Sequence, residues 1–174
     1  LCELFGLLKD DEHDQPVASI SRLVDSTQYP DGIWLRVDPV HVSADGNRLK
    51  LTDSSQFTLT QHDALEFASE INNLLKPYHL EIEVPCPTRW YLKFNEDLNL
   101  KTRPIDSVIG QDILPFMPVG NDKINLDQLI NDIQMTLHDL PINLNRQEEK
   151  KLPINSVWLW GYGELPDILN RNWS

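Results

Sequence analysis

Hydrophobic residues recur at helical spacing in two long segments of this sequence. Thr60 and Asp63 precede the first stripe in the form of a capping box, and Pro77 follows it, where a helix ends. Asn125 precedes the second stripe and can cap it. The stripes are Leu65, Phe67, Ala68, Ile71, Leu74 and Leu75, and then Leu126, Leu129, Ile130, Ile133 and Leu137. Both patterns predict amphipathic helices that bury one face.

Other segments alternate apolar and polar residues with the period of a β-strand. Residues 33–38 place aliphatic side chains on one face and an indole, a guanidinium and a carboxylate on the other. Asp45-Gly46-Asn47 has the composition of a hairpin turn. We expect strands at 33–42, irregular and at an edge from Pro39 onward, and at 48–52, 80–84, 90–94 and 154–160. The strands should follow one another as a meander with one helix inserted.

Together these elements predict an α+β fold, with an antiparallel sheet of about five or six strands packed against two main helices. The 174 residues have the size of a single domain, spanning 1–174. Leu1 is not an initiator methionine, and the apolar segment 1–8 has no helix start before it. We therefore expect a fragment of a longer chain that lacks its N-terminal part.

The charge balance argues against polyanionic binding partners. Asp and Glu outnumber Lys and Arg by 27 to 15, which gives a net charge of -12. Such a field repels phosphate backbones, so we expect binding neither to nucleic acid nor to an anionic membrane. No apolar run approaches the ~20 residues of a membrane span, and no signal peptide is visible. Cys2 and Cys86 match no metal or redox spacing, which favours free thiols and a cytoplasmic protein.

Two histidines stand out as candidates for chemistry. Asp38 and His41, three residues apart, could bind a divalent metal, act as an acid/base pair or form a hydrogen-bonded loop. Gln134 and His138, four apart, share one face of the second predicted helix. A histidine near a helix C-terminus also suits the helix dipole without any further role. Asp38, His41 and His138 are thus weak candidates for metal ligands.

Neutral hydrogen-bonding groups gather near the end of the sequence, at the ends of predicted elements, as a small polar ligand requires. Trp158 and Trp160 alternate on the last strand, where they are either core residues or a stacking wall. In such a pocket Arg36 would recognise an anion and the amides would fix its orientation. The candidate pocket comprises Arg36, Asp38, His41, Trp90, Gln134, His138, Asn143, Asn155, Ser156 and Trp160.

Well-known catalytic motifs are missing from the sequence. There is no G-x-x-x-x-G-K-[ST], G-x-G-x-x-G, C-x-x-C, H-E-x-x-H or G-x-S-x-G. Neither a serine nor a cysteine nucleophile can be assigned, and the catalytic residues stay unassigned.

Four blocks of the sequence resemble the RpfE-type bacterial regulatory proteins. They are 34–41 (WLRVDPVH), 87–92 (PTRWYL), 134–143 (QMTLHDLPIN) and 153–161 (PINSVWLWG). Members of that family are often labelled cofactor-independent phosphoglycerate mutases. True mutases of this kind resemble the alkaline phosphatase superfamily, with a serine nucleophile and two divalent metals held by Asp and His clusters. This chain matches neither the serine motif nor that ligand set.

Two functions follow as alternatives. The first is an uncharacterised bacterial regulatory or ligand-binding module that recognises a small polar or phosphorylated metabolite. The second is a metal-dependent phosphoryl-transfer enzyme or hydrolase, as the phosphoglycerate mutase label implies. In the second, Asp38, His41 and His138 would hold manganese or magnesium, or act as acid and base. That hypothesis requires the three side chains to converge within reach of one metal ion.

Overall fold

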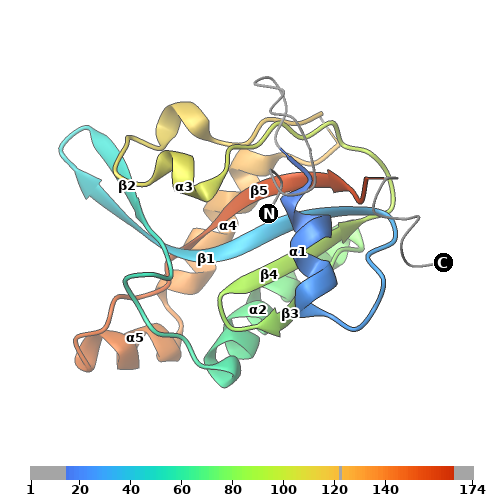
Figure 1. Ribbon diagram of the computed structural model, residues 1–174. Coiled ribbons are helices and arrows are strands. Elements are labelled where there is room, and N and C mark those ends of the chain that lie inside the picture. The colour runs from blue at the N-terminus through green and yellow to red at the C-terminus, as the bar shows by residue number, and fades with distance from the viewer. Residues whose placement is uncertain (1–14, 122, 167–174) are drawn as a thin grey trace.

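The computed structural model describes residues 15–121 and 123–166, and in them one antiparallel sheet is packed with helices, which confirms the predicted α+β class (Figure 1). The strands are β1 (Ile33–Asp45), β2 (Arg48–Thr52), β3 (Ile82–Cys86), β4 (Arg89–Phe94) and β5 (Ser156–Glu164). The helices are α1 (Val17–Asp25), α2 (Gln61–Leu75), α3 (Ile105–Val108), α4 (Leu126–His138) and α5 (Pro141–Glu148). Short 3-10 turns occur at Lys76–Tyr78 and Leu114–Phe116. The apolar segment 1–8, including Cys2, lies outside the described residues.

Strand β1 is the centre of the sheet. The strand order is β2-β1-β4-β3, and β5 pairs with β1 as well. The 13 residues of β1 allow this, because its first part pairs with β4 and β5 while residues 41–45 pair with β2. The expected meander is therefore wrong, whereas from Pro39 onward each residue of β1 pairs with one strand only, β5 or β2, as at an edge. The ladder with β4 ends at Arg36, so the proline, which has no N–H to donate, does not interrupt it.

Both faces of the sheet are covered. Helices α2 and α4 pack on the face that carries Leu35 and Val37, and with them enclose the largest apolar core. Helix α1 lies on the other face against β1 and β5, in front of the sheet in Figure 1. That face carries Trp34, Trp158 and Trp160, the last two packed with residues of α3. The odd and even positions of β1 thus serve two different cores.

Local signals at the helix ends are confirmed. Thr60 and Asp63 form the capping box of α2, with the Asp63 N–H donating to Thr60 Oγ1 at 3.1 Å. Asn125 caps α4, because its Oδ1 accepts from the Gln128 N–H at 3.0 Å. In each helix, a backbone N–H group of the first turn is thereby hydrogen-bonded to a residue three positions earlier.

Two prolines lie within regular secondary structure. Pro85 was expected to end the strand before it, yet it stays inside β3, which is tolerated because β3 is an edge strand. Pro141 begins α5 in the first helical turn, where its missing N–H has no bond to lose. The segment after α4 is consequently helical.

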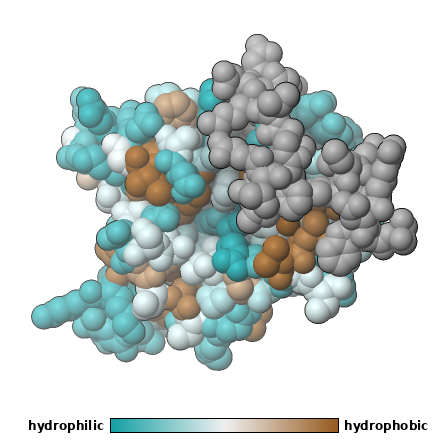
Figure 2. Space-filling view, viewed as in Figure 1, coloured by the Kyte–Doolittle hydropathy of each residue, from teal (hydrophilic) through white to brown (hydrophobic). Residues whose placement is uncertain are grey.

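The surface over α5 and over the tip of the β1–β2 hairpin is mainly hydrophilic in the view of Figure 2, with smaller hydrophobic areas between them. Within the described ranges, no helix has both the length and the apolar character needed to cross a membrane.

Candidate functional site

Arg36, Asp38 and Trp160 meet on the face of the sheet that α1 covers. Arg36 pairs with Trp160 in the antiparallel register of β1 and β5, which places these side chains on one face. Arg36 Nε donates to Asp38 Oδ1 at 2.9 Å and Nη2 donates to Oδ2 at 2.7 Å, while Trp160 Nε1 donates to the same Oδ2 at 2.8 Å. Arg36 and Asp38 are 6% and 5% exposed. The guanidinium is thus bound to a carboxylate inside the protein.

The Arg36 guanidinium is also held from two other sides. It lies between two rings, with its Cζ 5.1 Å from the Trp160 centroid and 5.3 Å from that of Tyr91. Its Nη1 donates to Ser21 Oγ on α1 at 3.3 Å. Burial raises the pKa of Asp38, against the opposing effects of Arg36 and the Trp160 N–H. These contacts make the cluster an anchor between α1 and the sheet.

A second acid, whose side chain is also buried, lies beside this cluster. Asp25 accepts two hydrogen bonds of 2.6 Å from Arg89 and one of 2.5 Å from the Tyr91 hydroxyl. Burial acts to raise the pKa of Asp25, but the hydrogen bonds from Arg89 and Tyr91 outweigh it and the pKa is lowered. Asp25 ends α1, so this acid ties the helix end to β4.

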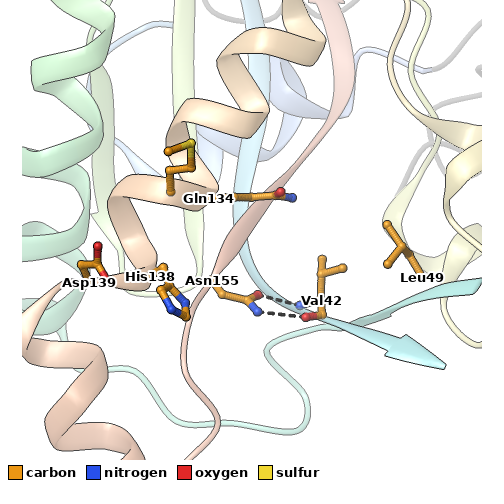
Figure 3. A pocket seen from close by; sticks show the side chains of 7 residues that line it. Val42, Leu49, Gln134, His138, Asp139 and Asn155 are labelled. Carbon is orange, nitrogen blue, oxygen red and sulfur yellow. Dashed lines mark hydrogen bonds between the residues drawn. The ribbon is translucent and has the colours of Figure 1, made fainter. Parts of the chain in front are cut away.

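Gln134 and His138 line a groove between α4 and the β1–β2 hairpin (Figure 3). The groove has a volume of about 410 Å³, and its other lining residues are Val42, Leu49, Met135, Asp139 and Asn155. A neighbouring cavity of about 250 Å³ shares Val42, Leu49 and Gln134 and reaches Ser156. Gln134 Nε2 donates to Ser156 Oγ at 3.1 Å. Gln134, His138, Asn155 and Ser156 of the predicted pocket are therefore neighbours in space.

The two asparagines of the predicted pocket bond to the backbone. Asn155 Oδ1 accepts from the Val42 N–H at 2.7 Å and its Nδ2 donates to the Val42 carbonyl at 2.9 Å, as the dashed lines in Figure 3 show. Asn143 is 1% exposed and bonds to Leu137 and Ile154. Asn155 lines the groove with both amide atoms occupied, and Asn143 lies below the surface.

His41 lies apart from both groups, and Trp90 reaches the buried cluster only through a backbone hydrogen bond to Asp38. Trp90 packs in the core below α2, with its Nε1 donating to the Pro87 carbonyl at 2.8 Å. His41 Nδ1 lies 2.9 Å from the Pro153 carbonyl oxygen. The ten residues of the predicted pocket are therefore distributed over a buried cluster, a groove and separate structural positions.

The candidate metal ligands do not come together. Strand β1 continues through Asp45, so Asp38 and His41, three residues apart, point to opposite faces of the sheet. His138 is exposed at the C-terminal end of α4, whereas Asp38 is buried below α1. In residues 15–121 and 123–166, no group of three His, Cys, Asp or Glu side chains could hold a metal ion. The described residues do not fit the divalent metal that the phosphoryl-transfer hypothesis requires.

Comparison with known proteins finds partial similarity to proteins that carry the name of one enzyme. The chain is 27% identical over 135 residues to a probable 2,3-bisphosphoglycerate-independent phosphoglycerate mutase from Geobacter sulfurreducens, covering 77% of this chain and 34% of that protein. It is 38% identical over 63 residues to the mutase of Methanosarcina mazei, covering 36% of this chain and 16% of that protein. The chain thus spans about a third or less of the length of these relatives. No family model matches it.

A solved structure shares the fold. The cofactor-independent phosphoglycerate mutase from Thermoplasma acidophilum superposes with a TM-score of 0.52 at 12% sequence identity, over 77% of this chain and 37% of that chain. At this identity the likeness is one of fold alone.

The buried cations Arg22 and Arg146 were missed by sequence reasoning, and Arg22 is paired with Glu83. Arg146 is 5% exposed and lines a third cavity, with Lys150 and Lys151. In the run Asn145 to Lys151 an arginine reads as part of a solvated surface. A signal was present nevertheless, because Arg146 follows the buried Ile142 by four residues and so shares its helix face.

Proposed function

We propose that this chain takes part in phosphoryl transfer of the phosphoglycerate mutase type and binds a phosphorylated hydroxy acid. The observation that carries the proposal is the 135-residue match to the Geobacter sulfurreducens protein, whose name is that of such a mutase. The likeness of fold to the Thermoplasma acidophilum mutase supports it. Of the two functions inferred from the sequence, these findings favour phosphoryl transfer.

The described residues are assigned to handling the substrate rather than a metal. They offer no group of three metal ligands, so we derive no step through a metal ion. In the groove, the imidazole of His138 lies at the C-terminal end of α4, where its ring nitrogens can donate or accept a hydrogen bond. Gln134 keeps its amide oxygen as an acceptor while its Nε2 bonds Ser156. These two groups can orient an acid that also carries hydroxyl groups.

The purified chain should therefore be titrated with 3-phosphoglycerate and 2-phosphoglycerate by calorimetry. The same chain should be assayed for interconversion of the two by phosphorus NMR, with and without manganese. We expect binding that His138→Ala weakens, with His62→Ala as a control, because His62 is an exposed histidine on α2 away from the groove. Failure of both phosphoglycerates to bind would remove the proposal.

A regulatory module of the RpfE type is the second candidate. One observation favours it: the described residues provide a groove for a small molecule but no three-donor metal group. The two functions differ in turnover. Binding of a phosphoglycerate without any interconversion, even with manganese, would support the regulatory module, and interconversion would exclude a purely regulatory role. A cytoplasmic location and the lack of nucleic-acid and membrane partners remain predictions of the sequence.

A further inference from the structure

Three cations line a pocket between α5 and the segment that joins β2 to α2. The pocket has a volume of about 420 Å³ and is bounded by residues 55–58, by Arg146 and by residues 150–152. Its charged side chains are Arg146, Lys150 and Lys151, and none of the described residues lining it is acidic. The lining of this pocket is thus cationic in a chain of net charge -12.

Arg146 carries the only unpartnered buried side-chain nitrogen or oxygen in the described part of the chain. Its Nε donates to the Leu152 carbonyl at 2.9 Å and its Nη1 to the Thr58 carbonyl at 3.1 Å. Its Nη2 is buried and has no hydrogen-bond partner among the described residues. A buried charged donor without a partner destabilises a fold, so an acceptor at Nη2 gains a strong interaction.

Charge around Arg146 is only partly balanced. Burial lowers the pKa of its guanidinium, against the opposing charges of Asp63 and Glu149. Glu149 itself pairs with Lys151 at 2.6 Å. On the far wall, the Ser55 hydroxyl donates to Asp53 at 2.6 Å, which occupies the hydroxyl proton. The nearby carboxylates are thus partly engaged elsewhere, and Arg146 and Lys150 keep charge available for a ligand.

The backbone at the end of α5 places the lysines at this pocket. The Lys150 N–H donates to the Gln147 carbonyl at 3.0 Å and the Lys151 N–H to the Arg146 carbonyl at 2.8 Å, as in a Schellman cap. Such a cap needs a left-handed residue, and Lys150 has a φ of 59° where glycine is usual. A lysine therefore occupies a position where glycine would be less strained.

We propose that this pocket binds a phosphate group, either of a small metabolite or of free phosphate. Arg146 Nη2 donates to one oxygen, while Lys150 and Lys151 balance the charge of the dianion. Because Nη2 is buried, neighbouring side chains must shift for the oxygen to reach it. The site stands independently of the mutase-like function, since it shares no lining residue with the groove.

The test is calorimetric titration of the chain with inorganic phosphate at constant ionic strength, set by sodium chloride. We expect saturable binding that the double variant Lys150→Gln/Lys151→Gln weakens roughly tenfold or more, because the charge of Lys150, unpaired among the described residues, and the Glu149-paired charge of Lys151 are both removed from the pocket lining. Lys101→Gln is the matched control, an exposed lysine outside the pocket, and should bind phosphate as the wild type does. Arg146→Lys, which keeps the charge but not the fork, should weaken binding further.

Titration with 3-phosphoglycerate and with glycerate separates the two sources of phosphate. Binding of 3-phosphoglycerate that competes with phosphate, together with no binding of glycerate, identifies a phosphorylated metabolite; binding of phosphate alone identifies the free anion. The proposal is overturned if phosphate does not bind, if chloride competes equally, or if the lysine double variant and Lys101→Gln bind alike. Loss of phosphoglycerate binding in His138→Ala, with phosphate binding intact, would instead place the metabolite in the groove and leave only free phosphate here.

Discussion

Arg36 and Asp38 lie on the same face of β1 and form a buried two-point ion pair, with Nε to Oδ1 at 2.9 Å and Nη2 to Oδ2 at 2.7 Å. Trp160, more than a hundred residues later in the chain, donates to the same carboxylate. The guanidinium that the sequence offered as an anion receptor is thus neutralised within its own strand. The ion pair therefore contributes to the stability of the fold.

Breaking this pair should be costly. Asp38→Asn leaves the Arg36 charge buried without a counter-ion, which costs about 3–5 kcal/mol for pairs of this kind. Urea denaturation measures the change in the free energy of unfolding. Asp45→Asn, which removes one partner of the exposed pair with Lys50, is the control and should change stability by less than about 1 kcal/mol. Equal effects of the two variants would contradict a buried ion pair.

Acid should weaken the contact between α1 and β4 through Asp25. The pKa of Asp25 is lowered in the folded state, so the unfolded chain binds the proton more readily. The stability that Asp25 provides is therefore complete above its unfolded pKa of about 4 and is lost as pH falls through the folded value. Asp25→Asn should be less stable than the wild type at pH 7, by about 2 kcal/mol, as for hydrogen bonds to a charged group.

That difference should begin to shrink as the pH falls below about 4, where the unfolded wild type takes up a proton, and should disappear once the folded carboxylate is neutral as well. Urea titrations of both proteins between pH 7 and pH 3 provide the measurement. A difference that stays constant over this range would show that the charge of Asp25 contributes nothing.

Asn143, on α5, should be essential for joining the end of α4 to the segment before β5. Its Nδ2 donates to the carbonyls of Leu137 and Ile154 at 2.7 and 2.8 Å, and its Oδ1 accepts from the Ile154 N–H at 2.9 Å. Asn143→Ala leaves these buried groups unpaired and should cost about 2–4 kcal/mol. Asn145→Ala, on the exposed side of the same helix, should cost less than about 0.5 kcal/mol. Thermal denaturation of both variants checks the contrast.

Lys150 should supply positive charge to the phosphate pocket while lowering the stability of the fold. Lys150→Gly removes the penalty for a side chain at φ 59° and should stabilise the fold by about 1 kcal/mol. Lys150→Ala keeps the penalty and is the control for loss of the charge. A gain in melting temperature for the glycine variant, together with weaker phosphate binding in both variants, is the expected result. If alanine stabilises as much as glycine, backbone strain is not the reason.

Much of the secondary structure followed from short-range patterns. The stripe of α4, the Thr60–Asp63 capping box and the hairpin at Gly46 each depend on residues within a few positions of one another. Such signals act through local sterics and hydrogen bonds, so they can be read without knowing the fold. The antiparallel pairing of β3 with β4 belongs to the same group, because a short turn joins them.

The placement of the candidate site depended on contacts between distant residues. The sequence placed Gln134 and His138 on one helix face, and both side chains line the groove. It did not show that Arg36 lies away from the groove, or that His41 and Asp38 lie on opposite faces of the sheet. Those outcomes follow from the central position of β1 and its register with β5, and a register that joins residue 36 to residue 160 leaves no periodic mark in the sequence.

The sequence by itself thus determined the elements, the α+β class and the acidic surface, because each is a property of neighbouring residues or of composition. Only the tertiary structure decided which polar groups are neutralised and which are left to bind. Arg36 pairs with a carboxylate and lies between two aromatic rings, whereas Arg146 donates to two carbonyls and has no partner for Nη2 among the described residues. The same side chain acquires opposite roles because burial and pairing are set by residues far away in the chain.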